Sequence, residues 1–125
     1  MIDIQEVIQI HSTLIEEFGG SNGVRDYGLL VSAINRPFGG TENSEFYPTI
    51  HEKAGALIES LVKNHPFIDG NKRTGYVIMR LFLMQNSYDL EATQDDKYKF
   101  VIDIASGKLT IDQITLWIIN HLKKQ

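Results

Sequence analysis

The segment from Tyr76 to Met84 is almost wholly apolar, and Arg80 is its only charged residue. A helix that is apolar on nearly all of its sides usually lies at the centre of a fold. The segment is too short to cross a bilayer, because a spanning helix needs about 20 apolar residues. It therefore predicts a buried central helix, beginning near Asn71 and ending near Asn86, against which the other elements pack.

Helical spacing dominates the rest of the chain. Apolar residues between Ile4 and Phe18 recur at the intervals that define one helix face. Gly19 is typical of a helix end, and Pro37 is expected to stop a second helix. The predicted helices cover residues 4–18, 27–36, 49–64 and 71–86, and two more begin near Thr93 and Thr110. We therefore predict an all-α fold, a compact bundle of about six helices around the central one.

The same spacing predicts which faces are buried. In the helix over residues 49–64, Lys53 lies off the apolar stripe and is expected on another face. The stripe expected to bury the fifth helix consists of Tyr98, Val101, Ile102 and Ala105. Residues 37–48 are rich in glycine and polar side chains, which indicates a loop. A small hairpin or flap is compatible with this loop.

Composition limits the class of protein. The 125 residues fit one domain over 1–125, and a hydrophobic fraction of 42% can supply its core. No cysteine is present, which excludes disulfides and thiolate chemistry. The formal net charge of −4 argues against direct nucleic-acid binding. Asp3 and Glu6 interrupt the first apolar residues, so no signal peptide is expected. We predict a cytoplasmic protein without a membrane partner.

Polar chemistry is concentrated in the loop that leads into the central helix. Residues 65–75 read His-Pro-Phe-Ile-Asp-Gly-Asn-Lys-Arg-Thr-Gly. A helix start presents unpaired N–H groups and a partial positive charge, which together suit an anion. Gly70 allows a tight turn and the close approach of a ligand. The loop therefore favours a phosphate site over a solvated surface turn.

Lys72 and Arg73 add two full charges to the first helical turn, where the helix dipole disfavours cations. Arginine can grip phosphate oxygens through two N–H groups, and lysine acts as a point charge. An anionic partner explains the presence of both side chains. The alternative is a pair of solvated surface cations.

His65 and Asp69 are the candidate catalytic residues. A carboxylate beside a phosphate site suits Mg²⁺, although Asp69 is equally suited to cap the helix. An imidazole can take up a proton near neutral pH, as a general base must. The alternative for His65 is to cap the end of the preceding helix. Phe67 is expected to anchor the loop in the core.

The remaining histidines, His11, His51 and His121, are expected to have structural or surface roles. Zinc sites use cysteines or closely spaced histidines. The chain has neither, so no zinc site is predicted.

The loop resembles the central motif of the Fic/Doc superfamily, His-Pro-Phe-X-Asp/Glu-Gly-Asn-Gly-Arg-X-X-Arg. Residues 65–71 match without a gap, and Arg73 matches the first arginine. The run Asn-Lys-Arg-Thr at residues 71–74 resembles the death-on-curing (Doc) branch of that superfamily. Similarity to Doc-type sequences extends to residues 23–33 and 47–54.

The resemblance implies a compact helical fold that transfers a phosphate-containing group from ATP to a protein hydroxyl. His65 is implied to deprotonate that hydroxyl, and Asp69 to hold Mg²⁺ or to assist the histidine. The implied phosphate cradle consists of Gly70, Asn71, Lys72 and Arg73. Residues 38–47 would correspond to a flap that lines up the target segment.

Lys72 and Tyr76 depart from the motif of the enzymes that transfer AMP, which carry glycine and a second arginine there. In the Doc branch the nucleotide is understood to bind reversed, so that the γ-phosphate is transferred to serine or threonine. The resemblance thus implies a Doc-like toxin that phosphorylates elongation factor Tu and inhibits translation. The alternatives are a Fic-type AMP transferase and a catalytically silent helical binding module.

A self-inhibitory Ser/Thr-X-X-X-Glu-Gly/Asn motif, which many Fic proteins carry, is not found. The stretches beginning at Ser12 and Thr41 have the spacing, but Glu17 and Phe46 occupy the last position. The resemblance therefore implies control by a separate antitoxin protein. In the Doc branch the antitoxin inserts a C-terminal segment into a groove on the toxin.

Overall fold

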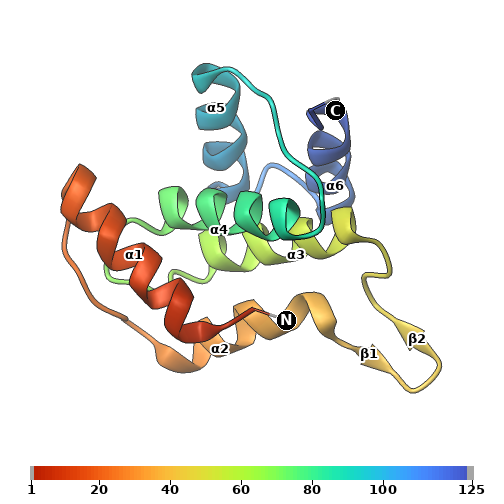
Figure 1. The fold of residues 1–125 in the computed structure, drawn as a ribbon, viewed down its shortest axis with the longest axis horizontal. Helices are drawn as coiled ribbons and strands as arrows, with labels where there is room; N and C mark the ends of the chain where they lie inside the picture. Colours follow the sequence, from red (N-terminus) through yellow and green to blue (C-terminus); the bar gives the residue numbers. More distant parts are fainter. Residues whose placement is uncertain (1, 124–125) are drawn as a thin grey trace.

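The computed structural model describes residues 2–123, which form six α-helices, a 3₁₀ turn and a short antiparallel hairpin (Figure 1). The elements are α1 (Ile4–Phe18), α2 (Tyr27–Asn35), η1 (Arg36–Phe38), β1 (Gly40–Thr41), β2 (Ser44–Glu45), α3 (Ile50–Lys63), α4 (Asn71–Gln85), α5 (Gln94–Ala105) and α6 (Ile111–Asn120). The predicted all-α class is confirmed. No helix in this part of the chain has both the length and the apolar surface needed to cross a membrane.

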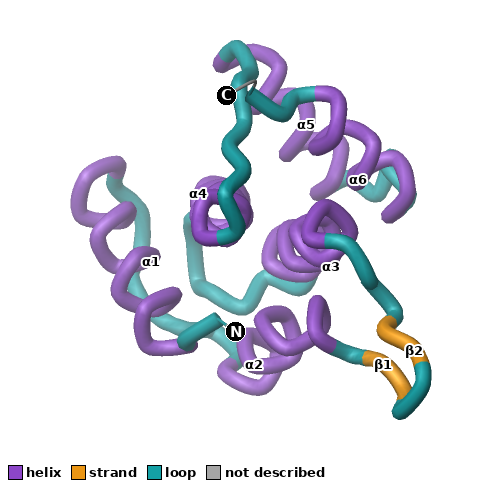
Figure 2. The backbone as a smooth tube through the Cα atoms, turned by 45° about the vertical axis from the view of Figure 1, so that its right-hand side comes forward, coloured by secondary structure: helices purple, strands orange, loops and turns teal. Residues whose placement is uncertain are grey.

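The helices α3 and α4 lie side by side at the centre of the fold (Figures 1 and 2). Figure 2 shows α1 and α2 on one side of this pair, and α5 and α6 on the other. The close approach requires Gly75, because a Cβ atom there would lie 2.9 Å from Cγ2 of Val62. The predicted central helix is present, and it shares the centre with α3.

Most of α3 is buried, and the buried residues include Lys53, which the spacing placed on another face. The ammonium group of Lys53 donates to the carboxylate of Glu45 at 2.9 Å and to the main-chain oxygen of Tyr47. Both acceptors belong to the hairpin and the segment after it. The periodicity of one helix carries no information on such a partner, so the burial of Lys53 could not be predicted from it.

The loop over residues 37–48 contains the hairpin, with Thr41 opposite Ser44. Pro37 does not end the helical path at once, because the chain continues from α2 through η1. Figure 1 shows the hairpin and the loop between α3 and α4 at opposite ends of the long axis of the molecule. In this structure the hairpin therefore does not border the predicted site.

The stripe predicted to bury α5 is its core face only in part. Val101 is buried together with Phe100 and Ile104, whereas Tyr98 is 71% exposed. The Phe100 ring stacks on Trp117 of α6 with 3.8 Å between the ring centres, which anchors α5 to α6. Tyr98 and Ile102 instead line a pocket between α5 and α4. The apolar periodicity of α5 is real, and part of it faces this pocket.

Candidate active site

The loop between α3 and α4 is held from outside by the segment that precedes α2. The main-chain oxygen of Pro66 accepts N–H groups from Arg25 at 2.8 Å and Asp26 at 3.1 Å. The N–H of Ile68 donates to the oxygen of Gly23 at 3.0 Å. These backbone contacts fix the path of the loop independently of its own side chains.

Arg25 also ties the end of α3 to the start of the loop. Its guanidinium donates to the main-chain oxygens of His65 at 2.6 Å and Asn64 at 2.8 Å. Asn64, and not His65, is the C-cap of α3. His65 itself is exposed and has a φ of 50°, a conformation that non-glycine residues adopt at a cost of about 1–2 kcal/mol. Such strain persists where the surrounding contacts enforce it.

A buried histidine of α1 packs against the loop and forms a hydrogen bond with it. His11 of α1 is 1% exposed, and its ring stacks on Phe67 with 3.8 Å between the ring centres. The Nε2 atom of His11 lies 2.7 Å from the main-chain oxygen of Asp69. Because a carbonyl oxygen only accepts, Nε2 carries the hydrogen of this bond. The expected structural role of His11 and the expected core role of Phe67 both agree with this geometry.

Asn71 closes the loop through its side chain. Its Oδ1 accepts the N–H of Phe67 at 2.9 Å, and its Nδ2 donates to the oxygen of Phe67 at 3.0 Å. Asn71 is 8% exposed, and its amide is committed to these two bonds. What it offers to a ligand is the backbone N–H at the first position of α4.

The carboxylate of Asp69 is exposed at the mouth of the loop. Its Oδ2 accepts the N–H of Ser21 at 3.2 Å, and its Oδ1 accepts the N–H of Gly70 at 2.8 Å. These two bonds lower the pKa of the Asp69 carboxyl below its ordinary value, so the group is ionised near neutral pH. Asp69 does not cap α4, because the N-cap position belongs to Gly70.

Gly70 leaves the start of α4 open. Its φ of 73° and ψ of 18° are left-handed, and it supplies no side-chain cap to the first turn. A Cβ atom at this position would lie 3.1 Å from Cδ1 of Ile15 and 3.6 Å from Nε2 of His11. Glycine is therefore required by both backbone conformation and space. The N–H groups of the first turn are left to bind an anion.

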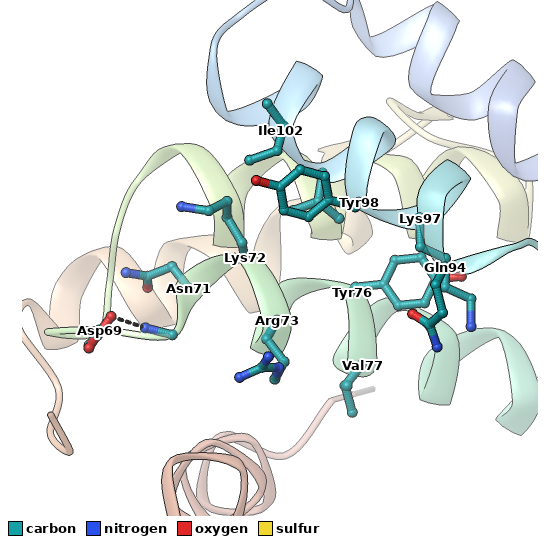
Figure 3. Close-up of a pocket in the computed structure, with 12 residues that line it drawn as sticks. Asp69, Asn71, Lys72, Arg73, Tyr76, Val77, Gln94, Lys97, Tyr98 and Ile102 are labelled. Carbon is teal, nitrogen blue, oxygen red and sulfur yellow. Dashed lines mark hydrogen bonds between the residues drawn. The ribbon is translucent and has the colours of Figure 1, made fainter. Parts of the chain in front are cut away.

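A pocket of about 390 Å³ lies between the first turns of α4 and the face of α5 (Figure 3). The α4 side is lined by Asp69, Gly70, Asn71, Lys72, Arg73, Tyr76 and Val77. The α5 side is lined by Gln94, Lys97, Tyr98, Val101 and Ile102. Its volume is within the usual range for small-molecule sites. One wall is charged and carries an open helix start, and the other is largely aromatic and aliphatic.

The charge of the pocket is opposite to that of the whole chain. Lys72, Arg73 and Lys97 face a single carboxylate, Asp69, whereas the chain carries a formal net charge of −4. None of these cations belongs to the ion pairs found within residues 2–123. The guanidinium carbon of Arg73 lies 4.1 Å from the ring centre of Phe18, at the end of α1. The arrangement suits an anionic ligand.

Tyr76 lines the pocket at the end away from Asp69 (Figure 3) but contributes no charge. It is 9% exposed, its hydroxyl has no hydrogen-bond partner in the described structure, and burial raises its pKa to about 12. The phenol is therefore neutral at physiological pH. Lys97 of α5 lies over the Tyr76 ring, with Nζ 5.7 Å from the ring centre.

A divalent cation could bind in this pocket only together with a phosphate-bearing ligand. No group of three or more histidine, cysteine, aspartate or glutamate side chains within residues 2–123 forms a metal site. Mg²⁺ is commonly bound by one or two carboxylates together with substrate phosphates. The ionised, exposed Asp69 at the pocket mouth matches this donor set, because each of its oxygens keeps a second acceptor site.

The structure brings Asp69, Gly70, Asn71, Lys72 and Arg73 to one pocket, as their adjacency suggested. His65 lies on the same loop but does not line that pocket. Sequence reasoning missed the α5 wall and the supports of the loop. The missed residues are Phe18, Arg25, Gln94, Lys97 and Tyr98. The stripe from Tyr98 to Ala105 was the one available signal, and it was interpreted as core.

Comparison with known proteins finds a matching family model and similar relatives. The model of the Fic/DOC family matches residues 1–83. "Toxin Doc" of Mycolicibacterium smegmatis is 45% identical over 78 residues, which cover 62% of this chain and 60% of that relative. "Protein kinase doc" of Escherichia phage P1 is 24% identical over 113 residues, which cover 90% of this chain and 88% of that relative. The chain thus spans 60% of the length of the first relative, and the family match ends before α5.

Proposed function

This chain belongs to the Fic/DOC family, and on that premise we propose that it transfers the γ-phosphate of ATP to a serine or threonine hydroxyl of another protein. The observation that carries the proposal is the charge of the pocket. Three cations that form no ion pair within residues 2–123 and an open helix start converge there, in a chain with a formal net charge of −4. A polyphosphate is the ligand class that this arrangement suits best.

The proposed reaction uses Asp69, at the loop end of the pocket, and His65, which lies on the same loop outside the pocket lining. The hydroxyl oxygen of the target attacks the γ-phosphorus, and the bond from that phosphorus to the β–γ bridging oxygen breaks. ADP leaves, and the hydroxyl proton passes to the imidazole of His65. Bound Mg²⁺, held by Asp69 and phosphate oxygens, would neutralise part of the phosphate charge. Lys72, Arg73 and the N–H groups of the first turn hold the phosphates during the transfer.

The pocket supports one orientation of the nucleotide. Its apolar wall lies on α5, and its loop end is marked by Asp69 (Figure 3). A nucleoside at the far end of the pocket, beside Tyr76 and Gln94, directs its phosphate chain along α4 towards Asp69 (Figure 3). In that orientation the terminal phosphate is the one nearest the loop that carries the proposed base. This favours phosphoryl transfer over the transfer of AMP.

The proposed biological role is that of a toxin held by an antitoxin. One relative is named a toxin and another a protein kinase. We propose elongation factor Tu, a translation factor, as the protein substrate and the cytoplasm as the compartment. Phosphorylation of this factor would inhibit translation, and a separate antitoxin protein would control the activity.

The test is transfer of label to purified elongation factor Tu in the presence of Mg²⁺, with γ-labelled and α-labelled ATP in parallel. We expect label on the protein from the γ position only, and none with the His65→Asn variant. The His121→Asn variant, changed at the other end of the chain, should retain the wild-type rate. Label from the α position only would contradict the kinase proposal and support AMP transfer. Growth arrest that survives His65→Asn would favour a binding module.

A further inference from the structure

Lys97 is the one cation of the pocket that does not come from the motif loop or α4. It extends from α5, and its Nζ atom lies 5.7 Å from the centre of the Tyr76 ring (Figure 3). The residue is partly buried between the two helices and lines the pocket. Tyr76 lies three residues beyond Arg73, a rise of roughly 4.5 Å along the axis of α4. Lys97 therefore lies against a part of α4 beyond the phosphate cradle (Figure 3).

The charge of Lys97 is not used inside the protein. It belongs to none of the ion pairs found in residues 2–123. Lys99, two positions further on the same helix, provides the contrast. Its ammonium is paired with Asp103 at 2.9 Å, and the side chain is 77% exposed. A lysine placed over a neutral aromatic ring keeps its N–H donors for a ligand, because the ring takes up none of them.

Resting on the proposed function, we propose that Lys97 is a nucleotide-binding residue that holds the α-phosphate. Asp69 marks the end of the pocket at which phosphoryl transfer takes place, and Lys97 lies at the other end. An ATP molecule with its γ-phosphate at Asp69 therefore presents its α-phosphate to α5. Lys72 and Arg73, at the first turn of α4, hold the phosphates between these two ends.

The experiment compares the binding of ATP, AMP and adenosine by calorimetry, with wild-type protein and the variants Lys97→Ala, Lys97→Arg and Lys99→Ala. AMP keeps only the α-phosphate, and adenosine has none. Loss of one charged contact is expected to weaken ATP and AMP alike, by roughly tenfold in Lys97→Ala. Adenosine binding should stay unchanged. Lys97→Arg should restore most of the loss, and Lys99→Ala should bind all three ligands as the wild type does.

Three results would overturn the inference. If Lys97→Ala binds ATP and AMP with wild-type affinity, Lys97 holds no phosphate, and the kinase proposal stands without it. If ATP is weakened but AMP is not, Lys97 holds a phosphate other than the α-phosphate. If wild-type protein binds no ATP, both the inference and the proposed function fail. A melting temperature equal to that of the wild type separates a binding effect from a loss of packing against Tyr76.

Discussion

The Nε2 atom of His11 in α1 donates to the main-chain oxygen of Asp69, 58 positions later in the chain, over 2.7 Å. The same ring stacks on Phe67. One buried side chain therefore touches both sides of the turn that carries the acidic residue. The position of the Asp69 carboxylate depends on α1, although no residue of α1 belongs to the motif.

Replacing His11 by phenylalanine should keep the stacking and remove the donor. A buried carbonyl left without its partner costs about 1–3 kcal/mol, so the free energy of unfolding should fall by about that amount. His121→Phe is the matched control, because the ring of His121 also stacks on an aromatic ring and also bonds a main-chain oxygen at 2.7 Å. Urea unfolding should show a loss for both variants, and ATP binding should weaken for His11→Phe alone. Unchanged ATP affinity in His11→Phe would contradict the role of His11 in placing the loop.

The contact between Arg73 and Phe18 predicts an effect on ligand affinity and only a small one on folding. Phe18 is 59% exposed, so Phe18→Leu should lower the free energy of unfolding by no more than about 1 kcal/mol. An exposed cation–π contact contributes about 0.5–1 kcal/mol, so ATP binding should weaken roughly twofold to fivefold. Phe46→Leu, at an equally exposed phenylalanine on the hairpin side, should have no effect. Titration with a fluorescent ATP analogue measures the difference, and equal affinities for the two variants would refute it.

Because the backbone of His65 is left-handed, a suitable substitution can remove the imidazole without destabilising the fold. Asparagine tolerates this conformation better than other non-glycine residues. His65→Asn should therefore match or exceed wild-type stability, by up to about 1 kcal/mol, while the rate of phosphoryl transfer falls by roughly 10²-fold to 10⁴-fold. His65→Ala should lose the same activity and gain no stability. Thermal unfolding measures the stability of the two variants, and label transfer measures their activity. An active His65→Asn variant would exclude His65 as the base.

The Tyr76 hydroxyl has no hydrogen-bond partner in the described structure. Removing a buried, unpaired hydroxyl eliminates its desolvation cost. Tyr76→Phe should thus be as stable as the wild type or more stable, and Lys97 should still lie over the ring. A clear loss in the melting temperature would show that the hydroxyl has a partner after all, such as the nearby pair of Arg80 and Asp89.

The ion pair of Arg80 and Asp89 makes the stability of the protein depend on pH. The hydrogen bonds from Arg80, at 2.8 and 3.2 Å, lower the pKa of Asp89 to about 2. A carboxyl whose pKa is lower in the folded state stabilises the protein above its unfolded pKa, near 4. This contribution is lost as the pH falls from about 4 through 2. Asp89→Asn should be destabilised at pH 7 and should approach the wild type only below about pH 2, as urea unfolding at several pH values can measure.

The fold and half of the site could be predicted because their signals are local. The apolar segment after Tyr76 and the spacing of apolar residues in α1 determine helices that the structure contains. The cradle from Asp69 to Arg73 is contiguous, so its residues necessarily meet. The resemblance of the loop to the Fic/Doc motif agrees with the family match over residues 1–83.

The remainder depends on contacts between distant segments, for which one sequence holds no periodic signal. Lys53 is buried because a hairpin covers it, and Arg25 reaches the main chain of a loop 40 positions later. Tyr98 follows a helical stripe that looks identical whether it faces a core or a pocket. The flap at residues 38–47 forms a hairpin as considered, but it lies away from the cradle in this structure (Figure 1).

The two walls of the pocket have different origins in the chain. The charged wall lies within the region that matches the family model, and the α5 wall lies beyond residue 83. Substitutions on α5 can therefore change which ligand is retained and how tightly, while the groups proposed to transfer the phosphoryl group stay in place. Ligand choice and chemistry can diverge separately in such a protein. Exchanging only α5 between relatives is thus a route to new nucleotide preferences on an unaltered catalytic loop.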